Sequence, residues 1–190
     1  MSFFHTLFIT AYSTNIGIHI ASNIRGDSST TGIVTAINAG FALLIGISFS
    51  KISLIFKQYT MPFSIFVGGM GFLAITLMKD SMAGILLASA CCGISLSCFM
   101  AQASYMISTS VNQVAIALAS GVFALVGGIG GLTSPIVLNE ISKGVFKNQS
   151  TNSVFLICMV GLFLLFIYSL VSVKLNEKRE IKLANIKVIE

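Results

Sequence analysis

The sequence predicts an all-α integral membrane protein, and three observations lead to this fold class. Of the 190 residues, 55% are hydrophobic and only 9% are charged, whereas soluble domains average about 25% charged residues. Residues 81–139 contain no Asp, Glu, Lys or Arg, and one membrane crossing needs roughly 20 apolar residues. The apolar runs also lack the charged face of a surface helix and the short alternating pattern of a transmembrane strand.

Six apolar runs predict six membrane-spanning helices in chain order, at residues 3–23, 30–50, 60–78, 83–107, 115–138 and 153–173. Short polar connections separate them, so little of the chain is left for a soluble catalytic domain. The predicted membrane part is 1–174, and the charged run 175–190 is a predicted cytoplasmic tail.

The distribution of basic residues predicts the orientation. An even number of spans places both termini on one side, together with Lys51, Lys57, Lys174, Lys178, Arg179, Lys182 and Lys187. The opposite side carries Arg25, Lys79, Lys143 and Lys147. The positive-inside rule therefore predicts a multi-pass protein of the cell membrane with both termini in the cytoplasm. The net charge of +5 then indicates a basic membrane-flanking surface, and no nucleic-acid partner is expected.

The first predicted span carries its strongest polar side chains on one stripe. At 100° per residue, Tyr12, Asn15 and His19 share a face, whereas the reverse side carries Thr10 and Thr14. Threonine can satisfy its hydroxyl on its own helix backbone, but an unpartnered amide or imidazole costs several kcal/mol in hydrocarbon. The stripe should therefore face other helices or a water-filled path. Hydrogen bonds between helices and the lining of a cavity both remain open as interpretations.

Other predicted spans also carry polar side chains, which favours the interpretation that these residues line a cavity. The second span contains Thr35 and Asn38, and the fourth contains Gln102 and Tyr105, whereas the third and sixth are plainer. We therefore expect the polar spans to surround a cavity and the plain spans to support it from outside. The predicted cavity-lining residues are Tyr12, Asn15, His19, Thr35, Asn38, Gln102 and Tyr105.

The fifth predicted span is rich in glycine. Small residues at intervals of four let two helix backbones approach closely, and this pattern predicts helix packing at Gly121, Gly127, Gly128 and Gly131. Pro135 follows and removes one backbone hydrogen bond near the helix end.

Catalytic and metal chemistry are not expected. No predicted span contains Asp or Glu, and two histidines cannot build a zinc site without further ligands. The four cysteines, Cys91, Cys92, Cys98 and Cys158, lie in apolar runs without a CxxC pair, so we expect small apolar residues and no disulfide framework. The sequence therefore predicts no enzyme, no catalytic residue, no metal and no cofactor.

Two local patterns point to a repeat and to a family. "SKISLIFKQ" follows the second span and "SKGVFKNQ" follows the fifth, an echo that favours a three-plus-three repeat of helices.

The stretch "NQVAIALASGVFALVGGIGGLTSPIVLNEIS" is similar to the eleventh helix, with its lead-in, of major facilitator superfamily transporters. "GISFSKISLIFK" resembles a degraded copy of that family's loop G-x-x-x-D-R-x-G-R. Gly46 matches the first glycine and Lys51 the arginine, whereas Ser50, Ser53 and Leu54 depart from the pattern.

This resemblance covers nearly the whole chain and is strongest to drug- and metabolite-efflux members. It implies one six-helix lobe, the C-terminal one, of a twelve-helix transporter. It also implies efflux of a small organic solute by alternating access. The implied partners are the lipid bilayer, the solute, and a second six-helix lobe or a second copy of the chain. The chain would then be a split half or a truncated product. The alternative is a non-transporting membrane interaction protein derived from such a lobe.

Overall fold

A computed structural model describes the backbone of residues 1–146 and 150–187 and the side chains of residues 1–146 and 150–178. Its helices are α1 Ser2–His19, the π-helix η1 Ile20–Ile24, α2 Ser28–Phe56, the 3-10 helix η2 Lys57–Tyr59, α3 Thr60–Leu77, α4 Met82–Ser110, the 3-10 helix η3 Gln113–Ala115, α5 Ile116–Phe146 and α6 Thr151–Lys187. The described residues form no strand. The predicted all-α class is therefore confirmed.

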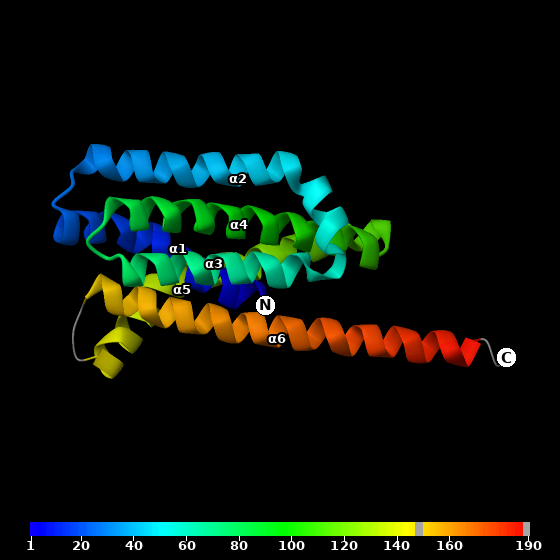
Figure 1. Ribbon diagram of the computed structural model, residues 1–190. Coiled ribbons are helices and arrows are strands. Elements are labelled where there is room, and N and C mark those ends of the chain that lie inside the picture. The colour runs from blue at the N-terminus through cyan, green and yellow to red at the C-terminus, as the bar shows by residue number, and fades with distance from the viewer. Residues whose placement is uncertain (147–149, 188–190) are drawn as a thin grey trace.

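The helices lie side by side in one elongated bundle, with α2 along one edge and α6 along the opposite edge (Figure 1). α1 packs mainly on α5, α2 packs mainly on α4, and α3 lies between α4 and α6. The C-terminal part of α6 projects beyond the other helices (Figure 1).

Within the described residues, four helical stretches are long and apolar enough to cross a membrane: Ser28–Leu77, Met82–Ser110, Gln113–Phe146 and Thr151–Lys178. They are compatible with a location in a membrane. The first stretch is 50 residues long and contains α2, η2 and α3, which run in opposite directions around the turn at η2 (Figure 1). α1 is not among the four, in keeping with its polar side chains, so the count of six membrane spans stays a prediction.

Several helices run past the apolar segments that the sequence predicts. α2 continues to Phe56, α5 to Phe146 and α6 to Lys187. Hydropathy marks only the apolar part of a helix, whereas Lys, Glu and Leu are good helix formers on either side of that boundary. The predicted border between membrane part and tail, after residue 174, therefore falls inside α6. Residues 188–190 of the predicted tail lie outside the described chain.

The connection between α1 and α2 is ordered by its own side chains. Arg25 adopts a left-handed backbone with φ 56°, and Asp27 then begins α2. The Asp27 carboxylate accepts hydrogen bonds from the backbone N–H and the hydroxyl of Thr30, each at 2.9 Å. These bonds, the backbone one foremost, hold the pKa of Asp27 below its ordinary value.

The buried core is built unequally by the helices. Its side chains come mainly from α1, α3, α4 and α6, with Phe72, Phe99 and Phe155 fully buried. α2 and α5 each contribute little, mainly Val34 and Leu138. These two helices therefore flank the core and leave broad apolar faces exposed.

Candidate functional site

His19 links three segments of the chain at one end of the bundle. Its side chain is fully buried, with Nε2 3.0 Å from the carbonyl oxygen of Lys79 and Nδ1 3.1 Å from the hydroxyl of Thr151. A carbonyl oxygen only accepts, so Nε2 carries the proton and donates, and in the neutral ring Nδ1 accepts from Thr151. The ring also meets Phe155 edge-on at 5.3 Å. His19 therefore ties the end of α1 to the α3–α4 connection and to the start of α6.

Tyr12 also lies inside the bundle. It is 3% exposed, and its ring meets Phe72 of α3 edge-on at 6.4 Å. His5, on the same stripe, stacks on Phe99 at 3.9 Å and reaches Ser95 of α4 with Nε2 at 3.1 Å. This stripe of α1 faces other helices, one of the two arrangements that the sequence left open.

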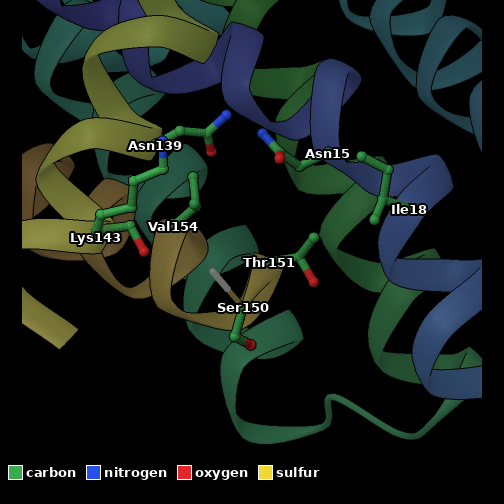
Figure 2. A pocket seen from close by; sticks show the side chains of 8 residues that line it. Asn15, Ile18, Asn139, Lys143, Ser150, Thr151 and Val154 are labelled. Atoms are coloured by element: carbon green, nitrogen blue, oxygen red, sulfur yellow. The ribbon is translucent and has the colours of Figure 1, made fainter. Parts of the chain in front are cut away.

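Asn15 differs from its neighbours on the stripe because it opens on a cavity. A space of about 410 Å³ lies between α1, α5 and α6 and is lined by Asn15, Ile18, Asn139, Ser142, Lys143, Ser150, Thr151 and Val154. The side chains of Asn15 and Asn139 point toward one another across it (Figure 2). Asn15 donates from Nδ2 to the carbonyl oxygen of Ala11 at 3.0 Å and to the Thr14 hydroxyl at 3.1 Å.

The lining of this cavity, the Asn15 cavity from here on, is polar with little net charge. Among the residues that the structure describes, Lys143 is the only charged one in the lining, and the Nζ of Lys143 lies 2.6 Å from a carboxylate oxygen of Glu140. An exposed pair three residues apart contributes little stability, but it offsets the lysine charge locally. The cavity therefore offers amides and hydroxyls to a solute that exchanges hydrogen bonds.

On α2, Thr35 and Asn38 differ in their hydrogen-bond partners. Asn38 donates to the carbonyl oxygen of Ser89 at 2.9 Å, which ties α2 to α4. Thr35 is exposed, and its hydroxyl donates to Thr31 of its own helix at 2.9 Å.

Gln102 and Tyr105 share a second cavity, at the end of the bundle away from Asn15. This space of about 590 Å³, called the Gln102 cavity below, lies where α2 and α4 end against α6. Gln102 is 5% exposed and Tyr105 is 53% exposed. The structure thus divides the predicted lining residues among the bundle interior, the α2–α4 contact and two separate cavities, and it leaves Thr35 exposed on α2. Their role in binding a solute stays a prediction.

The predicted packing glycines of α5 fall on two sides of the helix. Gly127 faces Ser2 and Thr6, and Gly131 faces Thr10, so both lie against α1. A methyl group at Gly121 or Gly128 would meet nothing within 4 Å. Within this chain, those two positions face open space.

Sequence reasoning missed the residues that hold the helix pairs together. Thr6 donates to the carbonyl oxygen of Gly127 at 2.9 Å, and Ser134 donates to that of Leu7 at 2.6 Å. At Gly130, a side chain would collide with the carbonyl of Phe3. The spacing of Gly127, Gly130 and Ser134 marks one helix face. The predicted packing residues include Gly127 from this face but leave out Gly130 and Ser134.

Among the residues that the structure describes, no group of three His, Cys, Asp or Glu side chains could hold a metal ion. The four cysteines are free thiols.

Comparison with protein-family models, with curated proteins and with solved structures finds no match to this chain. The resemblance to major facilitator transporters therefore stays an expectation from the sequence, and the function is argued from the geometry.

Proposed function

We propose that this chain is one lobe of a membrane transporter for a small organic solute. The observation that carries the proposal is the pairing of helices between the two halves of the chain. The first helix packs on the fifth, the second packs on the fourth, and the third lies between the fourth and the sixth. A three-plus-three repeat, a common transporter plan, would produce this pairing.

The two long helix pairs use similar hydrogen bonds. In the α1–α5 pair, Thr6 donates to an α5 carbonyl, and Ser134 of α5 donates to an α1 carbonyl. In the α2–α4 pair, Ser89 donates to the carbonyl of Val34 at 2.5 Å, and Asn38 donates back to that of Ser89. Each helix thus gives one bond and receives one. Such bonds are worth about 0.6–1.7 kcal/mol each inside a membrane.

The exposed faces of α2 and α5 support the proposal that a second lobe packs against this chain. Both helices are long and apolar yet mostly unburied within the chain. In this proposal the chain has six spans: α2 and α3 cross separately, and α1, though shorter and more polar, crosses as well. The protein crosses the cell membrane several times in this proposal, and both of its termini lie in the cytoplasm. The second lobe is another chain or a second copy.

The solute in this proposal contacts the Asn15 cavity. Its paired amides and hydroxyls select a solute that both donates and accepts hydrogen bonds, whereas the adjacent Ile18 supplies an apolar contact. Efflux of an amphiphilic organic solute fits this mixture.

Dye efflux tests the proposal. Cells that express the chain together with a six-span partner from the adjacent reading frame should expel ethidium faster than cells that express either chain alone. Asn15→Leu and Asn139→Leu should slow efflux, whereas Gln113→Leu, an exposed amide outside both cavities, should not.

Two results would contradict the proposal. The purified chain alone, if it drove saturable, gradient-dependent uptake into liposomes, would be a complete transporter and no lobe. A chain without any six-span partner and without an effect on dye would be the non-transporting interaction protein instead. Reporter fusions test the orientation separately: a cytoplasm-dependent enzyme should be active at Glu190 and inactive at Lys79.

A further inference from the structure

The hydrogen-bond polarity of the Asn15 cavity narrows the class of solute that it can take. This inference rests on the proposed function, because it takes this cavity as the place where the solute binds. The volume of about 410 Å³ is ordinary for a small-molecule site. Selectivity then depends on which polar atoms of the lining are left to bond with a solute. Bonds inside the chain decide this for two of the lining residues.

Asn15 offers the cavity an acceptor. The residue is 6% exposed, and its Nδ2 group donates to the carbonyl oxygen of Ala11 and to the hydroxyl of Thr14. An amide has two N–H donors, so the oxygen Oδ1 is the atom that remains for a solute. An acceptor on a largely buried side chain is costly to leave without a donor. An N–H or O–H group of a solute would therefore bind favourably at Asn15.

Thr151 offers an acceptor for a different reason. Its hydroxyl has one hydrogen and donates it to Nδ1 of His19 at 3.1 Å, because Nε2 of His19 donates to the carbonyl oxygen of Lys79 and leaves Nδ1 as the acceptor. The oxygen of Thr151 keeps only lone pairs for the cavity. His19 thus sets the hydrogen-bond polarity of a residue in the lining.

The wall formed by α5 is less restricted. Asn139 points toward Asn15 across the cavity (Figure 2), and its exposed amide offers both donors and an acceptor. The charge of Lys143 is offset by Glu140, whose carboxylate oxygen lies 2.6 Å from Nζ. Because the oxygens of Asn15 and Thr151 would repel the lone pairs of a carboxylate, the cavity disfavours an organic anion. The donor groups of a solute therefore belong against α1 and α6.

We propose that the Asn15 cavity selects solutes that present amino or hydroxyl hydrogens to Asn15 and Thr151, and that it discriminates against solutes whose polar groups only accept. Ile18 of α1 and Val154 of α6 supply the apolar contact. Ethidium belongs to the selected class, since its two aromatic amino groups donate while their lone pairs are delocalised into the rings. Carboxylates, ethers and ketones of similar size lie outside it.

Binding to the purified full chain in detergent tests the proposal without a partner lobe. The probes are ethidium, its analogue without the two amino groups, and the analogue in which methoxy groups replace them. All three share one ring system and one charge, so they differ mainly in donors and acceptors. Isothermal titration calorimetry should show that the natural chain binds ethidium about 25-fold more tightly than either analogue, from two hydrogen bonds that each contribute about fivefold.

Two variants assign this preference to the two acceptors. Asn15→Leu should weaken ethidium binding about fivefold and leave the affinity for the analogue without amino groups almost unchanged. This variant should still fold, because the hydrogen bonds of Asn15 lie within α1. Thr151→Val, a change of nearly equal volume, should weaken ethidium binding by the same factor. Gln102→Leu in the Gln102 cavity and Thr35→Val on the exposed side of α2 should change neither affinity.

Equal binding of ethidium and its analogues, or no binding of any of them, would overturn the inference. A loss in Gln102→Leu as large as that in Asn15→Leu would overturn it too, because the dye would then occupy the Gln102 cavity. Failure of the proposed function looks different. If ethidium binds with the expected preference but is not expelled from cells that also express the partner lobe, the selectivity stands and transport fails. Efflux of all three dyes at one rate would leave transport and overturn the selectivity.

Discussion

The two faces of α1 satisfy their polar groups in different ways. On the inner face, His5 and His19 bond to side chains or carbonyls of other segments. On the outer face, the Thr14 hydroxyl bonds to the carbonyls of Thr10 at 3.2 Å and Ala11 at 3.3 Å, beside the exposed Phe4 and Ile18. Rings with two polar nitrogens need partners from elsewhere, whereas a hydroxyl one turn away from a carbonyl does not.

This difference changes which face can meet a solute. The most polar residues of α1 mostly point into the bundle, where His5 still leaves its Nδ1 without a partner among the described residues, and Asn15 opens on a cavity. On the other side of the helix, Thr14 and Ile18 are exposed, whereas Thr6 and Thr10 lie against α5. Side-chain polarity therefore indicates where a partner is needed, and it does not indicate that the partner is water or a solute.

The largest expected effect comes from separating α1 from α5, the contact that holds both faces in place. In Gly130→Ala the new methyl group collides with the backbone carbonyl of Phe3, which cannot move aside as a side chain can. We expect a loss of about 1–3 kcal/mol, measured by unfolding in mixed detergent. Gly128→Ala is the control, since it meets nothing within 4 Å; equal losses in the two variants would show that α1 and α5 do not pack as described.

A smaller effect tests the inner face. His19→Leu keeps most of the volume but removes both hydrogen bonds, to Lys79 and Thr151. We expect a loss of about 1–2 kcal/mol from two interhelical bonds, in the same unfolding assay. Thr14→Val, an equal-volume change on the outer face, should alter stability by less than about 0.5 kcal/mol. If Thr14→Val costs as much as His19→Leu, the two faces are not distinct.

Cysteine labelling sharpens the comparison by reporting where water reaches. With the four native cysteines replaced and the second lobe present, cysteines at Thr14 and Ile18 should react with a polar thiol reagent about tenfold faster than cysteines at Tyr12 and His19. The reactive thiolate needs water, and buried positions suppress it. Asn15→Cys should follow the fast group because Asn15 lines a cavity. Slow labelling at Thr14 and Ile18 would place the outer face against lipid and remove it from any solute path.

The smallest expected effect lies between the helices, at the Asp27 cap. Its pKa is lower in the folded chain than its ordinary value, so the carboxylate gives its full stabilisation above the ordinary pKa. That stabilisation is lost as the pH falls from about 4 downward through the folded pKa. Melting temperatures measured across this range should fall in the natural chain more than in Asp27→Asn, which cannot titrate. Parallel curves for the two proteins would rule out a titrating cap.

Much of the fold could be read from the sequence. The absence of charge over residues 81–139 and the order of apolar runs led to an all-helical bundle, because burial in an apolar medium requires helical backbone bonding. The ends of the helices could be predicted less well, because residues with high helix propensity continue beyond the last apolar residues of a span. The site was only partly accessible: the stripe on α1 was visible, but the partners of His19 lie 60 and 132 positions away in the sequence.

By itself, the sequence determined that the chain is helical and apolar and that the imidazoles of α1 need partners, since these follow from composition and local periodicity. Only the tertiary structure decided that Asn15 opens on one cavity and Gln102 on another, and that Gly130, not Gly128, meets α1. The reason is the direction in which each side chain points around its helix axis. Residues on one turn of a helix differ in direction by 100° per position, and which direction faces a neighbour depends on helices far away along the chain.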